Sequence, residues 1–147
     1  MLNVDLFFTA ALRDSADVIE VTEGRIFDPA RPLLDEEEDK IPYLIVTYDG
    51  GGSSGISKDN VIDDLDGATV SIIAVANDRE GLADLTETVS EAIEAAFEDA
   101  ETADFYERHD LGFYISGCTP SAGPVMMDEE KPCCYQKITY QCDTQKP

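Results

Sequence analysis

The feature that most constrains this chain is an apolar stripe with helical spacing between residues 78 and 101. Its members recur at steps of three and four residues, which is the period of one face of an α-helix. The stripe consists of Leu82, Leu85, Val89, Ile93, Ala96, Phe97 and Ala100. Asn77 and Glu80 have capping-box spacing, so the helix is predicted to begin near residue 78. A helix with so long an apolar face must bury that face against other elements.

Other segments predict a sheet for this helix to cover. Runs rich in β-branched and aromatic residues predict strands at about 24–27, 43–48, 68–76, 111–118 and 134–142. A shorter amphipathic helix is predicted at about 3–14. The order α-β-β-β-α-β-β predicts an α+β fold, with one long and one short helix packed on one face of a mainly antiparallel sheet.

The length favours a single unit. A chain of 147 residues that is 43% apolar is expected to form one globular domain over 1–147. Mobile loops are predicted near 28–41, 49–60 and 119–132, where Pro, Gly, Ser or acidic residues gather. The first of these loops contains the acidic run 35–39.

The charge excludes several partners. The chain has 32 acidic and 10 basic residues and a formal net charge of −22. Affinity for nucleic acid depends on Lys and Arg neutralising phosphates, so we expect no direct nucleic-acid binding and no binding to anionic membranes. The first residues lack the basic side chain of a secretory signal, and no apolar run approaches the ~18 residues of a membrane span. These observations predict a cytoplasmic protein without a membrane segment.

No group of residues has the pattern of an active site. Gly50 and Gly55 have the spacing of a phosphate-binding loop, but Ile56 stands before Ser57 at the position where Lys is required. His109 is the only histidine, which excludes a multi-histidine metal site. We therefore expect no catalytic residue, no cofactor and no dedicated metal site. Weak binding of a divalent ion in an acidic loop is left open.

The four cysteines also lack the spacing of a metal site or a redox motif. They are Cys118, Cys133, Cys134 and Cys142, and no Cys-x-x-Cys motif occurs. We interpret them as reduced thiols that serve as small apolar residues on strands. A redox role is the alternative interpretation.

A row of carboxylates lies opposite the apolar stripe of the long helix. It recurs at steps of three and four residues and consists of Glu80, Asp84, Glu87, Glu91, Glu94, Glu98 and Glu101. Each like-charge neighbour pair costs about 0.2–0.5 kcal/mol, whereas each large buried apolar residue contributes about 1.5–3 kcal/mol, so the helix forms despite the row. Two interpretations stay open: an ordinary solvated face, or a face that attracts a basic partner or repels DNA.

A second candidate contact lies in the predicted loop 119–132. Val125, Met126 and Met127 are adjacent apolar residues in an otherwise polar segment. Methionine adapts to irregular surfaces, and exposed apolar groups often mark protein contacts. We therefore predict that these three residues touch a neighbouring subunit or another protein.

The order of several segments carries a family resemblance. These segments are Gly24-Arg25-Ile26-Phe27, the run Pro42-Tyr43-Leu44-Ile45-Val46-Thr47-Tyr48 after a Pro-containing loop, a strand ending Ala74-Val75-Ala76 before a helix, and a last strand of the form Tyr135-x-x-Ile138-Thr139-Tyr140. Over roughly residues 1 to 143, the chain resembles the tail-terminator, or tail-completion, proteins of long-tailed phages and prophages, the group that includes the lambda minor tail protein U type.

The resemblance implies a structural role. Members of that family are small α+β subunits that form a hexameric ring on the last ring of tail-tube protein, stop tube growth and present a surface to the head connector. It implies a homo-oligomer that is present in the host bacterial cytoplasm during assembly and then in the virion tail. It implies no active site.

An inhibitor that mimics DNA is the alternative from another functional class. Carboxylates 3.5 residues apart on average lie about 5 Å apart along a helix axis, which is close to phosphate spacing. Such a protein would occupy a basic cleft of a nuclease or repressor. Lys131, Lys137 and Lys146 interrupt the acidic pattern near the C-terminus and weigh against this alternative.

Overall fold

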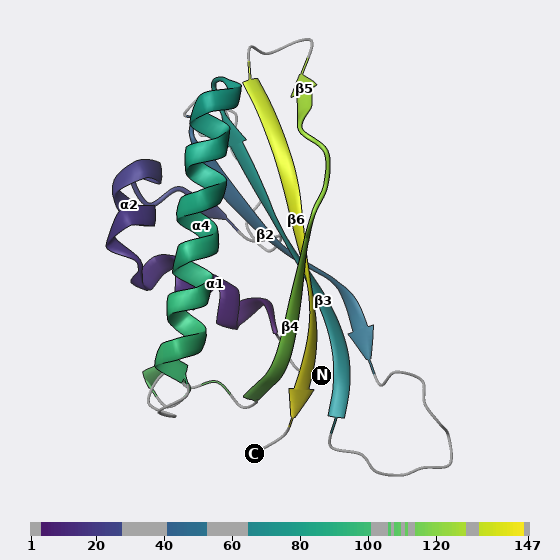
Figure 1. Ribbon diagram of the computed structural model, residues 1–147. Helices are drawn as coiled ribbons and strands as arrows, with labels where there is room; N and C mark the ends of the chain where they lie inside the picture. Colours follow the sequence, from purple (N-terminus) through teal and green to yellow (C-terminus); the bar gives the residue numbers. More distant parts are fainter. Residues whose placement is uncertain are drawn as a thin grey trace.

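The structure, a computed structural model, describes residues 4–27, 41–52, 65–100, 106, 108, 109, 111, 114–128 and 133–145. Its helices and strands are α1 (Asp5–Asp14), α2 (Ala16–Thr22), β1 (Ile26–Phe27), β2 (Tyr43–Gly52), β3 (Leu65–Ala76), α4 (Arg79–Ala100), β4 (Tyr114–Ala122), β5 (Met126–Asp128) and β6 (Cys133–Gln145). Figure 1 shows α1, α2 and α4 on one side of a twisted sheet.

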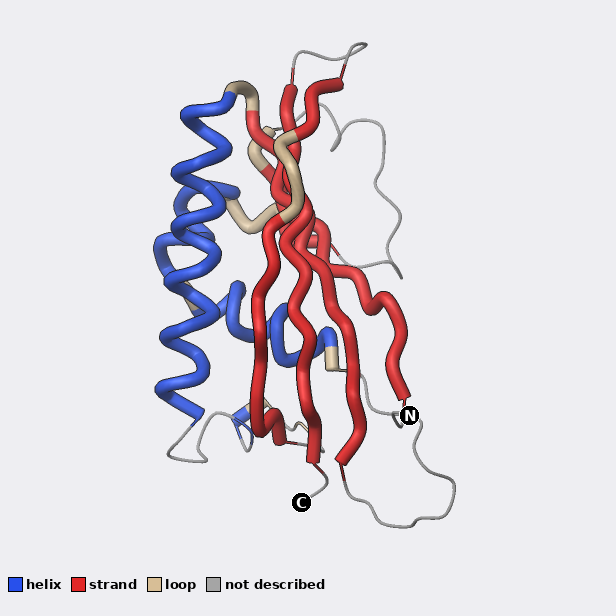
Figure 2. Tube along the Cα trace, turned by 45° about the vertical axis from the view of Figure 1, so that its right-hand side comes forward, coloured by secondary structure: helices blue, strands red, loops and turns tan. Residues whose placement is uncertain are grey.

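Within the described ranges, the sheet has six strands and is mostly antiparallel. Its order is β1-β2-β3-β6-β4, and β5 pairs with the beginning of β6. The pairing of β1 with β2 is parallel, and every other pairing is antiparallel. The helices form a second layer against this sheet, since α1 contacts β2 and α4 contacts β3 and β6; Figure 2 shows the long helix running beside the strands. The predicted α+β class, with a mainly antiparallel sheet, is confirmed.

The core lies between the two layers. Alternate strand residues face the helices and are buried, as the period of two along a strand requires. They include Leu44, Val46, Val70, Ile72, Ala74, Ile138 and Tyr140. The apolar stripe of α4 covers them and contributes Leu82, Leu85, Val89 and Ile93, each at most 2% exposed. Burying such side chains stabilises the fold by about 1.5–3 kcal/mol each.

An aromatic cluster joins α1 to α4 and to the sheet. The ring of Phe7 lies 4.7 Å from that of Phe97 and 5.8 Å from that of Tyr106, measured between centroids. Phe8 lies 5.0 Å from Tyr140 of β6. Both phenylalanines of α1 are completely buried, so this short helix is fixed by tertiary contacts rather than by its length.

The helices differ from the prediction in number and in one cap. The sequence predicts one short helix at 3–14, but the described chain forms α1 and then a separate helix α2, which the sequence pattern does not predict. Ser15 separates them because its backbone is extended and its Oγ accepts a hydrogen bond from Val18 N at 3.3 Å. The cap of α4 is Asp78, whose Oδ1 accepts from Gly81 N at 2.7 Å, in place of the predicted Asn77–Glu80 capping box.

The strands differ from the prediction mainly in their lengths. β2 runs through Gly52 instead of ending at Tyr48, because Gly50 to Gly52 pair with Thr69 to Gly67 of β3 after a bulge. β4 occupies 114–122 rather than 111–118. The predicted loop 119–132 contains the end of β4 and all of β5. Residues 28–40 and 53–60 of the other predicted loops lie outside the described residues.

Candidate assembly surfaces

The acidic row of α4 lies on the exposed side of the helix. Six of its seven predicted members are exposed, namely Glu80, Asp84, Glu87, Glu91, Glu94 and Glu98. Glu101 lies outside the described residues. The row is exposed because the apolar stripe on the other side of α4 packs against β3 and β6. The role of this row as a contact surface stays a prediction.

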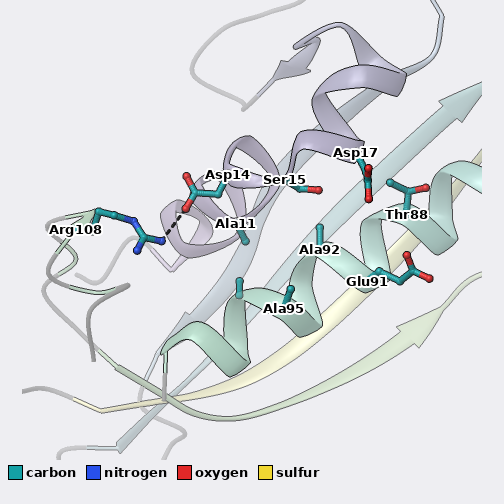
Figure 3. A pocket seen from close by; sticks show the side chains of 10 residues that line it. Ala11, Asp14, Ser15, Asp17, Thr88, Glu91, Ala92, Ala95 and Arg108 are labelled. Carbon is teal, nitrogen blue, oxygen red and sulfur yellow. Dashed lines mark hydrogen bonds and ion pairs between the residues drawn. The ribbon is translucent and has the colours of Figure 1, made fainter. Parts of the chain in front are cut away.

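Among the described residues, α4 borders a cleft on each of two sides. One separates it from α1 and α2, has a volume of about 520 Å³, and includes Asp14, Asp17 and Glu91 in its lining. Figure 3 shows Asp14 and Arg108 at one end of this cleft and Asp17, Thr88 and Glu91 at the other, with alanines between them. Charged ends and a small apolar floor give this cleft a polar, largely acidic character.

Asp14 is the centre of a small charge cluster at one end of this cleft. Its Oδ2 lies 2.9 Å from Nη2 of Arg108 and 2.9 Å from Nε2 of His109. Partial burial raises the pKa of Asp14, but the hydrogen bonds and charges of His109 and Arg108 outweigh it, so the net pKa lies below the ordinary value. The sole histidine therefore pairs with a carboxylate at the end of α1.

The second cleft lies between α4 and the edge strand β4. Two adjoining hollows of about 330 and 420 Å³ share Ser90 and Pro120 in their linings. Their walls include Glu87 and Glu94 of the acidic row together with Tyr140 of β6. The pKa of Tyr140 is raised to about 12; burial is the main cause, and the negative charge of Cys118 adds to it. The phenol therefore stays neutral across the physiological range.

Strand β4 borders this cleft and forms one edge of the sheet. It pairs with β6 on one side, and within the described residues no strand pairs with its other side. Pro120 lies opposite Tyr140 and supplies no N–H to a further strand. Proline at such a position is a known protection against edge-to-edge association of sheets.

The predicted apolar contact is exposed. Val125, Met126 and Met127 expose 40%, 46% and 54% of their surfaces, respectively. Met126 pairs with Tyr135 and Met127 with Cys134, so β5 forms a short strand beside the beginning of β6. Figure 1 shows β5 at the same end of the molecule as the first turn of α4. The structure therefore brings this apolar surface to the end where the acidic row begins.

The fold has a solved counterpart. A chain in the solved structure described as the virion of a native gene transfer agent particle matches it with a TM-score of 0.52 and 16% sequence identity. The match covers 94% of this chain and 91% of that chain, so the two share a fold over almost their whole lengths. No protein-family model and no curated protein sequence matches the chain.

Several features of these surfaces have no signal in local sequence. The pairing of Asp14 with His109 joins residues 95 positions apart, and the facing of Cys118 and Cys142 depends on the register of β4 against β6.

Within the described residues, no three side chains of His, Cys, Asp or Glu form a group that could hold a metal ion. No described helix combines the length and the apolar composition needed to cross a bilayer.

Proposed function

We propose that this chain is a structural subunit of a phage-type tail that caps the tail tube as a ring and connects it to the head. The observation that carries the proposal is the shared fold with a chain of the gene transfer agent virion, which extends over nearly all of both chains. The order of segments that resembles the tail-terminator proteins points to the same role. The proposal assigns the chain no catalytic step.

The electrostatics of the described surface support this role. The acidic row of α4 is exposed, and the whole chain has a net charge of −22. Carboxylates repel the phosphates of DNA, so a wall of such subunits would let DNA pass without binding it. The same charge would attract a basic surface on the tube protein or the connector.

The apolar surface on β5 supplies a candidate protein contact. Val125, Met126 and Met127 are exposed together beside the beginning of β6. Specific interfaces gain most of their affinity from a small apolar centre, with charged residues at the rim. In the proposed ring, these residues contact the neighbouring subunit or the tube protein, and the acidic row steers the encounter.

The full chain, mixed with preassembled tubes of its own tail-tube protein, provides the test. Negative-stain microscopy should show a ring at one tube end, and mass photometry should show six copies of the chain in each ring. The double variant Met126→Ser, Met127→Ser should reduce ring occupancy at least tenfold. The control Leu6→Ser, Val21→Ser removes two similarly exposed apolar residues of the helices and should leave occupancy unchanged.

The acidic row also supports the alternative role of a DNA mimic. Its described members, from Glu80 to Glu98, span about 27 Å of helix at 1.5 Å per residue. A monomer that does not bind tubes but displaces DNA from a basic restriction enzyme would replace the ring proposal with mimicry. A chain that neither binds tubes nor displaces DNA would contradict both proposals.

A further inference from the structure

Two cysteines face each other across neighbouring strands. Cys118 of β4 and Cys142 of β6 are directly paired in the antiparallel register, and their Sγ atoms lie 3.6 Å apart. Both are free thiols. Both lie on the helix-facing side of the sheet, since Cys142 is buried and Cys118 lines the cleft between α4 and β4.

The position of this pair in the ladder suits a covalent bond. Gly123 N donates to Lys137 O at 2.8 Å, and hydrogen-bonded and non-hydrogen-bonded pairs alternate along an antiparallel ladder. Cys118 lies five residues before Gly123 on β4, so Cys118 and Cys142 form a non-hydrogen-bonded pair. Such pairs have Cα atoms about 4.5 Å apart, within the range of about 4.4–6.8 Å found in disulfides. Side-chain rotation is then enough to bring the two sulfurs together.

We propose that Cys118 and Cys142 are a site of reversible disulfide formation in which Cys118 attacks a low-molecular-weight disulfide, such as oxidised glutathione, and Cys142 resolves the product. The oxidant reaches Cys118 through the hollow of about 330 Å³ between α4 and β4. Cys142 is only 3% exposed and reacts second. Both sulfurs belong to one chain, so the site does not depend on the proposed ring.

The two thiols differ in pKa, and the difference favours attack by Cys118 before Cys142. The thiol of Cys142 donates to the sulfur of Cys118, which lowers the pKa of Cys118 despite the opposing effect of burial. The same hydrogen bond, burial and the negative charge of Cys118 raise the pKa of Cys142. The thiolate is the attacking species in disulfide exchange, so the first step falls to Cys118.

The exchange is balanced in two steps. The Cys118 thiolate bonds to one sulfur of oxidised glutathione, the S–S bond of glutathione breaks, and the first glutathione leaves as a thiolate. The Cys142 thiolate then bonds to the Cys118 sulfur and expels the second glutathione. The protein loses two protons and two electrons, and the disulfide becomes two molecules of reduced glutathione.

The other two cysteines provide a matched control. Cys133 and Cys134 are consecutive residues of β6, so their side chains point to opposite faces of the sheet. Both are buried, and burial chiefly raises the pKa of Cys134. Disulfide exchange should therefore leave both as thiols in the folded chain.

Incubation of the folded full chain with oxidised glutathione tests the proposal. Intact-mass analysis should show the loss of two hydrogen atoms, and thiol titration after unfolding should fall from four groups to two. Peptide mapping should join Cys118 to Cys142. The closed bond should raise the melting temperature by about 5–10 °C, and dithiothreitol should reverse the rise.

Variants separate the two roles. Cys142→Ser should accumulate one glutathione on Cys118, whereas Cys118→Ser should remain unmodified. Cys133→Ser should form the disulfide as the wild type does. Four titratable thiols after oxidation of the wild type, or a mapped bond that includes Cys133 or Cys134, would overturn the proposal. Equal glutathione addition to Cys118→Ser and Cys142→Ser would overturn the assigned order.

Discussion

Oδ2 of Asp14 and Nε2 of His109 lie 2.9 Å apart although the two residues are 95 positions apart in sequence. The contact ties the end of α1 to the segment that follows α4. Asp14 also pairs with Arg108 at 2.9 Å, so a single carboxylate holds two neighbouring basic side chains. Asp14 and Arg108 line one end of the cleft between the helices.

Replacement of this carboxylate should have a small, pH-dependent effect. We expect Asp14→Asn to lower the free energy of unfolding by less than about 1 kcal/mol at pH 7, because exposed ion pairs contribute little. The pKa of Asp14 is lowered in the folded state. Its contribution is therefore complete above the unfolded pKa of about 3.9 and is lost as the pH falls through the folded pKa. Urea denaturation at pH 7 and pH 2 should show the difference from wild type shrinking, and an unchanged difference would contradict the pairing.

Tyr140 should titrate late. Its pKa is raised to about 12, chiefly by burial, whereas an unfolded tyrosine ionises near 10. Between these values the unfolded chain loses a proton that the folded chain keeps, so the free energy of unfolding falls as the pH rises. Phenolate absorbance of the wild type should show a late phase that Tyr140→Phe lacks. Tyr135→Phe is the control and should keep that phase; its loss there would contradict the assignment to Tyr140.

Reversal of one charge in the acidic row should stabilise the chain. Glu91 has Glu87 and Glu94 as row neighbours at helical spacing, so Glu91→Lys replaces two repulsions with attractions. We expect a gain of about 1 kcal/mol at low salt, which corresponds to about 2–4 °C in melting temperature, and a smaller gain at high salt. Glu20→Lys on α2 changes the net charge equally but should gain less. Equal gains for the two variants would show that net charge, not the row, sets the effect.

The link between α2 and β1 depends on a left-handed backbone. Glu23 and Gly24 have φ of 56° and 82°, and a Cβ on Gly24 would meet nothing within 4 Å. Gly24→Ala should therefore lower the free energy of unfolding by about 1 kcal/mol through backbone strain rather than through a clash. Gly24→Asn should cost less, because asparagine tolerates this region better. Chemical denaturation of both variants would check this order, and a larger loss for Asn would contradict it.

The sequence predicted the elements whose apolar pattern is long or uninterrupted. The stripe from Leu82 to Ala100 predicted a helix at 78–101, and the structure has α4 at Arg79–Ala100. The β-branched run after Pro42 predicted β2, although the strand continues into the glycines that follow. Both elements form because they bury apolar residues, and the periodic spacing of those residues is visible in the sequence.

The features that were missed depend on short segments or on register. α2 has only seven residues, and the cap of Ser15 is too weak a local signal to predict so short a helix. Pro120 and its neighbours indicate a loop. An edge strand tolerates proline, however, because the N–H groups on its outer side have no neighbouring strand to bond. The pairing of Cys118 with Cys142 follows only from the alignment of two strands, which no local pattern specifies.

Pro120 also bears on how copies of this chain can meet. An incoming strand at the β4 border would find a gap in the row of donors where the proline stands. A continuous backbone ladder cannot grow outward from that position, so recognition at this border is left to side chains. Contacts of that kind depend on individual side chains and on salt.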